Sequence, residues 1–114
     1  MNSNPRRISV IVPVLNEQEL VIPLEETIRR ATTADGVLEI IYVDGGSSDN
    51  TVSQAAKLDA QVLESAKGRA KQMNLGAREA QGDILYFLHA DTLPPFGLDQ
   101  DIINAVDGGM EAAC

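Results

Sequence analysis

Apolar runs alternate along the chain with amphipathic stretches, and this alternation predicts the secondary structure. Four runs predict the strands of a mostly parallel sheet, and the last of them is apolar enough to be buried on both faces. They cover residues 8–15, 38–43, 60–64 and 84–88. The first run contains Pro13, which has no N–H to donate to a ladder, so we expect the regular strand to end about there.

Between these runs, apolar residues recur at helical spacing and predict helices over about residues 17–31, 51–56, 69–81 and 98–106. Asn16 is a good N-cap for the first helix, and Glu19 follows three residues later, as in a capping box. Asp49 or Ser48 is expected to cap the second helix. The first and third helices are predicted to bury these residues: Leu20, Leu24, Ile28 and Ala31, and Ala70, Met73, Ala77 and Ala80.

This order of elements predicts one α/β domain over residues 1–114, with an open, mostly parallel sheet and helices on both faces. Right-handed crossovers allow the Rossmann-like strand order 3-2-1-4, with a switch point between the first and fourth strands. After a turn at Pro94-Pro95 and the last helix, Gly108-Gly109 should end that helix, and residues 110–114 resemble the opening of a further strand. The sheet would then keep an open edge, through which we expect self-association.

Acidic residues follow the second and fourth predicted strands. Asp44 precedes a Gly-Gly-Ser-Ser-Asp turn able to bring backbone amides close to a ligand, and Asp91 follows the fourth strand in His89-Ala90-Asp91. In the order 3-2-1-4 the two carboxylates flank the first strand, on the order of 10 Å apart, because strands lie about 4.8 Å from each other. That gap suits a nucleoside diphosphate and is too wide for both carboxylates to share one metal ion.

The same residues also have purely structural interpretations. Asp91 could cap the helix that follows it. Glu17 and Asp49 could be helix N-terminal charges that are favourable for the macrodipole. Arg69 could be a solvated surface cation.

Composition narrows the choice of partners. The net charge of -8 argues against nucleic acid, because phosphate backbones select basic surfaces. The single cysteine excludes an internal disulfide and a cysteine-based zinc site, which fits a reducing compartment. No apolar run approaches the roughly 20 residues of a membrane span, and the polar start is not a secretory signal. We therefore expect a cytoplasmic protein, with a peripheral position at the membrane left open.

Three segments together resemble the signature segments of family 2 glycosyltransferases, which are nucleotide-sugar-dependent enzymes of the GT-A fold. They are Val12-Pro13-Val14-Leu15-Asn16-Glu17, Val43-Asp44-Gly45-Gly46-Ser47-Ser48-Asp49 and His89-Ala90-Asp91. Gly68-Arg69-Ala70-Lys71-Gln72-Met73-Asn74 is similar to a bacterial subgroup catalogued beside radical-SAM and selenoprotein-related domains. The resemblance covers nearly the whole chain from Ile8 onward, and it implies inverting transfer of a sugar from a UDP-sugar donor to an unknown acceptor.

The resemblance also implies roles for residues on the base side of the donor. Pro13 and Leu15 would line the base pocket, and Glu17 would reach the ribose or the base. Asp44 would accept a hydrogen bond from the imide N–H of a uracil-like base.

On the diphosphate side, the resemblance implies that Arg69 approaches the base or the diphosphate and that Ala90 lies against the ribose. Asp91 would hold a divalent cation, Mg²⁺ or Mn²⁺. The sequence departs from the usual Asp-x-Asp here, since His89 takes the first acidic position. His89 could be a further metal ligand, a donor to the ribose, or a strand-end histidine without a binding role.

The second departure concerns length. Members of the family carry an acceptor half containing the carboxylate that deprotonates the acceptor hydroxyl, and no residue here is a good candidate for that base. A donor-binding portion that is inactive alone is therefore expected. A non-catalytic nucleotide-binding module acting through a partner is the alternative. A nucleotidyltransferase is disfavoured, because the loop at residues 16–19 is acidic and lacks glycine.

Overall fold

The computed structural model describes residues 7–32, 36–91 and 97–107. Four parallel strands form one sheet in the order β3-β2-β1-β4. The strands are β1 (Ile8–Val14), β2 (Val37–Asp44), β3 (Gln61–Glu64) and β4 (Ile84–Phe87), and the helices are α1 (Gln18–Ala31), α2 (Thr51–Ala55), α3 (Arg69–Glu79) and α4 (Leu98–Asp107). The α/β class and the predicted strand order are confirmed.

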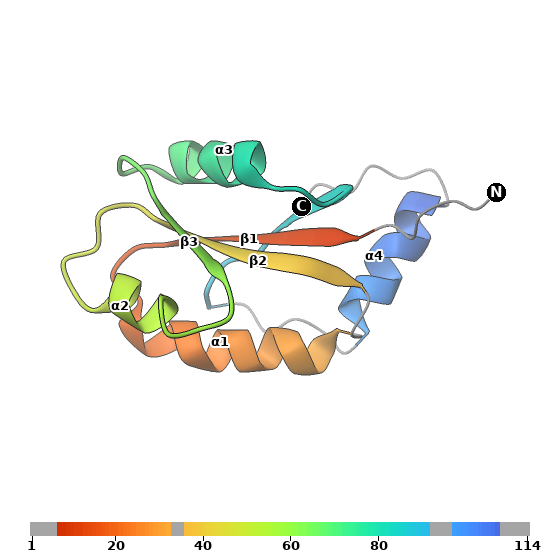
Figure 1. Cartoon of the computed structure of the whole chain (residues 1–114), viewed down its shortest axis with the longest axis horizontal. Helices are drawn as coiled ribbons and strands as arrows, with labels where there is room; N and C mark the ends of the chain where they lie inside the picture. The colour runs from red at the N-terminus through yellow and green to blue at the C-terminus, as the bar shows by residue number, and fades with distance from the viewer. Residues whose placement is uncertain (1–6, 33–35, 92–96, 108–114) are drawn as a thin grey trace.

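Helices cover the two faces of the sheet unequally. Helices α1 and α2 lie on one face and α3 on the other, while α4 lies beside the amino ends of the strands (Figure 1). The loops that leave the carboxyl ends of β1 and β2 are at the opposite end from α4. This arrangement leaves the carboxyl edge of the sheet free of a covering helix in the described part of the chain.

The larger core lies between the sheet and α1. It joins alternate residues of β1 and β2 to the inner face of α1: Ile8, Val10, Val12, Val14, Ile40, Tyr42, Val21, Leu24 and Ile28. Tyr42 is fully buried there, and its hydroxyl donates to Glu25 at 2.9 Å. Burial and the Glu25 carboxylate raise the pKa of the Tyr42 hydroxyl, so it stays protonated and remains a donor.

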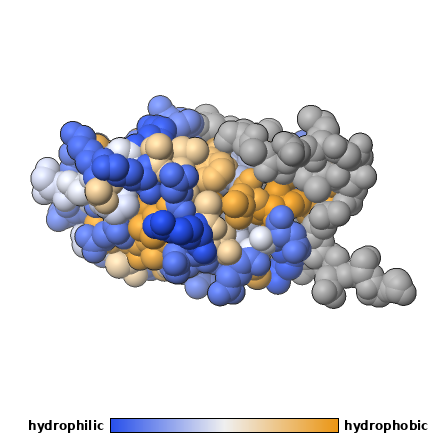
Figure 2. Space-filling view, turned by 90° about the horizontal axis from the view of Figure 1, so that it is seen from above, coloured by the Kyte–Doolittle hydropathy of each residue, from blue (hydrophilic) through white to orange (hydrophobic). Residues whose placement is uncertain are grey.

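The core under α3 is smaller and depends on a glycine. Ile11, Ile41 and Val43 are its buried members. A Cβ at Gly76 would stand 2.5 Å from an Ile11 methyl and 3.1 Å from a Val43 methyl, so glycine allows α3 to lie directly on the sheet. Leu85 and Phe87 of β4 are half-buried on this face, and apolar surface is visible beside α3 (Figure 2).

Strand β1 ends at Val14, one residue after Pro13, so the predicted end of the strand about Pro13 is confirmed. Pro13 lies opposite Val43 of β2. Residues two apart in a strand face the same neighbour, and Ile11 faces β4, where its carbonyl accepts the N–H of Leu88. The register between β1 and β4 ends at the Ile11–Phe87 pair. Pro13 lies beyond it, so its lack of an N–H removes no hydrogen bond from that ladder.

The buried residues of α1 and α3 differ in part from the predicted ones. Leu20 is 38% exposed, because the inner face of α1 begins at Val21. In α3 the buried residues are Gln72 and Gly76, Ala70 is exposed, and the helix ends at Glu79, two residues early. The helix lies closest to the sheet at Gly76, its smallest residue. A pattern of apolar residues does not reveal such a contact.

Three predictions fall outside the described residues: the Pro94-Pro95 turn, the Gly108-Gly109 helix end and the strand over residues 110–114. In the part of the chain that is described, no helix is long and apolar enough to cross a membrane.

Candidate functional site at the carboxyl ends of the strands

Asp44 organises the turn that follows β2. Its side chain is buried, with the residue 2% exposed. One carboxylate oxygen accepts the N–H groups of Gly46 and Ser47, each at 2.9 Å, and the other accepts the Ser47 hydroxyl. The carboxylate therefore holds the Gly-Gly-Ser turn in place.

The loop after β1 is held in a comparable way. Asn16 adopts a left-handed conformation with φ of 52°, which asparagine tolerates better than most residues. It is not the predicted N-cap, because α1 begins after Glu17. The Glu17 carboxylate instead accepts the N–H of Leu15 at 3.1 Å, just beyond the end of β1.

Reciprocal hydrogen bonds join these two loops. Ser48 donates its N–H to the Asn16 side chain at 2.8 Å, and Asn16 donates its N–H to the Ser47 hydroxyl at 2.8 Å. The Glu17 N–H is bound by the Thr51 hydroxyl at 2.8 Å. We call residues 15–18 and 44–51 the loop pair, because these contacts make them one unit.

Asp49 is shared between two helix starts within the loop pair. It accepts the N–H of Gln18 at 3.3 Å, which begins α1, and the N–H of Thr51 at 2.9 Å, which begins α2. The predicted cap of α2 was Asp49 or Ser48, but Asn50 stands at the cap position, and Asp49 binds the first N–H of the helix from one residue farther back. The Thr51 hydroxyl, followed by these backbone N–H groups, lowers the pKa of Asp49 below its ordinary value.

The other side of the edge carries exposed groups. Arg69, the first residue of α3, donates to a ring nitrogen of His89 just beyond β4. Both side chains are exposed, as is Asp91, while Ala90 is 5% exposed. We call Arg69, His89, Ala90 and Asp91 the β4 side. The structure thus brings together Arg69 and His89, residues 20 apart in sequence that the motifs did not link.

The sheet order places the predicted residues around one edge. Asp44 ends β2 and Asp91 follows β4, so the two flank β1, with Pro13 at its end and Leu15 after it, as predicted. Among the described residues, no three His, Cys, Asp or Glu side chains gather into a metal-binding group. The arrangement therefore offers separate carboxylates and the guanidinium of Arg69 at the carboxyl edge, where open α/β sheets bind ligands.

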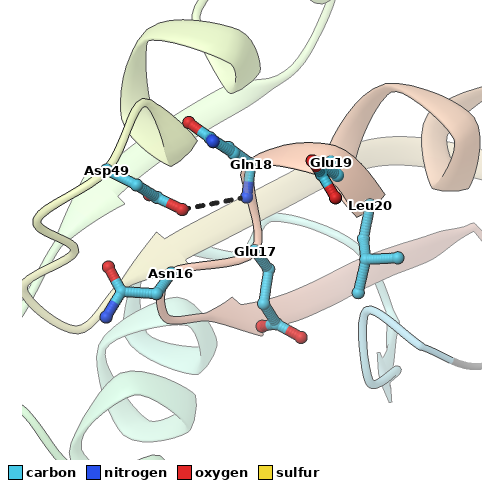
Figure 3. Close-up of a pocket in the computed structure, with 6 residues that line it drawn as sticks. All are labelled: Asn16, Glu17, Gln18, Glu19, Leu20 and Asp49. Carbon is cyan, nitrogen blue, oxygen red and sulfur yellow. Dashed lines mark hydrogen bonds between the residues drawn. The ribbon is translucent and has the colours of Figure 1, made fainter.

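A hollow of about 500 Å³ lies beside this edge and is not the predicted site. It is lined by Asn16, Glu17, Gln18, Glu19, Leu20 and Asp49 (Figure 3). Asp49 points toward the backbone of Gln18 in this view, whereas Glu17 points away from Asp49. Of the residues predicted to bind the donor, Glu17 alone lines it, so the hollow and the predicted site share one side chain.

Sequence reasoning missed the role of Gln72. This residue lies within the segment of residues 68–74, for which the sequence predicts no role at Gln72. It is 5% exposed, and its side chain forms hydrogen bonds with the ends of both β1 and β2. A single buried polar residue in a helix leaves no periodic signal in the sequence.

Known proteins are similar to this chain in sequence and in fold. The chain is 33% identical over 112 residues to the undecaprenyl-phosphate 4-deoxy-4-formamido-L-arabinose transferase of Proteus mirabilis strain HI4320, an alignment that covers 90% of this chain and 34% of the relative. The glucosyl-3-phosphoglycerate synthase of Mycobacterium tuberculosis, solved with Mn²⁺, UDP and glucosyl-3-phosphoglycerate, superposes with a TM-score of 0.72 at 26% identity, covering 89% of this chain and 39% of that one.

A mannosyltransferase of Pyrobaculum calidifontis, solved with GDP-mannose and Mn²⁺, superposes with a TM-score of 0.73 at 30% identity. That match covers 91% of this chain and 32% of the mannosyltransferase. The chain thus spans about a third of the length of the relatives it matches. The sequence model of the family described as glycosyl transferase family 2 matches residues 9–114, and the chain belongs to that family.

Proposed function

We propose that this chain binds the donor of a glycosyltransferase that uses a nucleotide-diphosphate sugar, with UDP as the nucleotide. The observation that carries the proposal is the assembly of the three signature segments at one edge, with Asp44 and Asp91 on either side of β1. UDP and GDP occur in the solved neighbours, so the fold accommodates both, and the preference for UDP is our inference from Asp44.

On the base side, we assign the base pocket to Pro13 and Leu15 and a ribose or base contact to Glu17. One oxygen of Glu17 already accepts the Leu15 N–H, which leaves the other for a ligand. Asp44 would accept the imide N–H of the base through remaining lone-pair capacity, since a carboxylate offers about four acceptor positions. Its three bonds within the loop would keep it oriented for that contact.

On the β4 side, Arg69 would approach the diphosphate and Ala90 would lie against the ribose. The residues present fit a divalent cation held mainly by the substrate, because Mg²⁺ commonly binds one or two carboxylates together with phosphate oxygens and waters. Asp91 is an exposed carboxylate at the required edge. We assign His89 to the contact with Arg69 rather than to the metal. The cation would neutralise charge on the departing diphosphate.

The inverting reaction needs an acceptor oxygen to attack the anomeric carbon while the bond to the diphosphate breaks and a base takes the proton. No described residue is placed for that last step, since the carboxylates of the edge are assigned to the donor and the cation. We propose that residues 1–114 form a single donor-binding domain and that this chain alone transfers no sugar.

We further propose that the 114-residue chain self-associates. Strand β4 pairs with β1 on one side and has no partner strand on the other within the described residues. Its residues Leu85 and Phe87 are half-buried. Unpaired N–H and C=O groups along such an edge recruit other chains. Light scattering over a range of concentrations tests this, and a monomer at all concentrations would refute it.

Titration calorimetry with UDP, GDP and TDP, each with and without Mn²⁺, tests the donor proposal. We expect UDP with Mn²⁺ to bind most tightly. Failure of all three nucleotides in the presence of Mn²⁺ would refute it. A parallel assay of donor consumption separates a binding portion from an enzyme, because turnover onto an acceptor by this chain would show that a base has been overlooked.

A further inference from the structure

Gln72 reaches from α3 through the sheet edge to the backbone of two strands. Its side-chain nitrogen donates to the carbonyl of Val14 at 2.9 Å and to the carbonyl of Val43 at 2.8 Å. Both bonds are buried, and the residue is 5% exposed. One amide group therefore joins the end of β1 to the end of β2.

These carbonyls stand where the two strands separate. Val14 ends β1 and pairs with Asp44, and its carbonyl also accepts the N–H of Gly45 at 3.0 Å. The next N–H of the chain, that of Leu15, is bound by Glu17 and has left the sheet. Gln72 thus supplies a last cross-link between β1 and β2 before their loops diverge.

The neighbouring glycine is explained by the same side chain. A Cβ on Gly45 would lie 2.8 Å from the amide carbon and the amide oxygen of Gln72, which is closer than real Cβ contacts allow. Gly45 does not adopt a left-handed conformation, unlike Gly46 with φ of 101°. Close approach of the amide, not backbone conformation, therefore requires glycine at residue 45.

We infer that Gln72 is a positioning residue for the donor site: its amide sets the distance between the ends of β1 and β2, and so places Leu15 and Glu17 relative to Asp44. The inference rests on the proposed function of this edge. Gln72 itself touches no proposed ligand. Packing alone is the competing explanation, and a methionine of similar length would satisfy packing without donating hydrogen bonds.

The first experiment compares Gln72→Met with Ser9→Ala by titration calorimetry with UDP and Mn²⁺. Ser9 is a matched control because it is fully buried, donates to Glu39 at 2.6 Å and accepts the N–H of Gly82 at 2.9 Å, near the opposite end of the same strands. We expect Gln72→Met to weaken UDP binding about tenfold, the equivalent of one lost pair of hydrogen bonds, and Ser9→Ala to leave it within about twofold. Equal affinities for wild type and Gln72→Met, or equal losses in both variants, would overturn the inference.

A second experiment is a double-mutant cycle with Gly45→Ala and Gln72→Ala. The added methyl group collides with the Gln72 amide, so Gly45→Ala should weaken UDP binding in the wild-type background. Combined with Gln72→Ala, the added methyl group no longer meets the Gln72 amide and should cause no further loss. Additive losses would show that Gly45 and Gln72 do not act through each other.

Hydrogen exchange distinguishes failure of this inference from failure of the proposed function. If wild type binds no nucleotide, the proposed function fails, and the exchange of the Gly45 amide, whose N–H binds the Val14 carbonyl, still reports on the strand ends. Its exchange should be at least tenfold faster in Gln72→Met and unchanged in Ser9→Ala. Unchanged exchange in both variants would refute the positioning role.

Discussion

The loop pair and the β4 side face the same edge of the sheet, yet their polar groups are used differently. In the loop pair, the side chains of Asn16, Asp44 and Asp49 accept hydrogen bonds from backbone N–H groups of the loops themselves. On the β4 side, Arg69, His89 and Asp91 are exposed. The loop pair is therefore held by its own hydrogen bonds, whereas the β4 side presents its charged groups at the surface, where we propose that the diphosphate and the cation bind.

The largest effect should come from removing the carboxylate that organises the loop pair. Asp44→Ala removes the acceptor of two part-buried hydrogen bonds from the N–H groups of Gly46 and Ser47, and a hydrogen bond to a charged group contributes about 1.5–3 kcal/mol. We therefore expect the free energy of unfolding to fall by about 2–4 kcal/mol, with loss of UDP binding. Denaturant unfolding measures the first effect and calorimetry the second.

Asp44→Asn is the control for that change, because its amide oxygen can still accept both N–H groups. It should stay within about 1 kcal/mol of wild type in stability while weakening the preference for UDP over GDP. If the alanine variant were as stable as the asparagine variant, the turn would not depend on this carboxylate.

The next effect should appear on the β4 side without a change in stability. Asp91→Asn removes the exposed charge that we assign to the cation. We expect UDP binding in Mn²⁺ to weaken about tenfold and to become insensitive to metal, while the free energy of unfolding stays within about 0.5 kcal/mol of wild type, as for most surface changes. Calorimetry with and without Mn²⁺ measures the change. A variant that still responded to metal as wild type does would move the cation away from Asp91.

A smaller effect should follow from restoring the carboxylate that the family usually has at the first acidic position. His89→Asp would give a second carboxylate near Asp91 and would replace the imidazole partner of Arg69 with an anion. We expect Mn²⁺ to strengthen UDP binding several-fold more than in wild type. His89→Asn is the control that removes the imidazole without adding charge, and an equal response of both variants would contradict the prediction.

The sequence predicted the sheet well because strands and their order depend on apolar runs and on crossover handedness, both of which are local or topological. It placed Asp44 and Asp91 on either side of β1 for the same reason. It failed for contacts between distant residues. Asn16 matched a capping box within its own helix, but its side chain binds Ser48, 32 residues away.

The role of Gln72 was also hidden from the sequence. Its two acceptors are 58 and 29 residues away, and no local pattern connects them. Likewise, the Arg69 contact with His89 depends on α3 bringing its first residue close to the end of β4. Roles of motif residues in binding were suggested by resemblance, while their roles in holding the loops came from the structure.

The smallest predicted effect is a pH dependence within the loop pair. The pKa of Asp49 is lowered in the folded chain, chiefly by the Thr51 hydroxyl. A carboxyl group with a lowered folded pKa contributes stability that is complete above its unfolded value, about 3.9, and that is lost as the pH falls through the folded value. Asp49→Asn should therefore be less stable than wild type at pH 6, and the difference should shrink below about pH 4. Urea unfolding at a series of pH values measures it, with Thr51→Ser as a control that keeps the hydroxyl donor and should follow the wild-type pH dependence. Parallel curves for Asp49→Asn and wild type down to pH 3 would show that ionised Asp49 does not hold the two helix starts together.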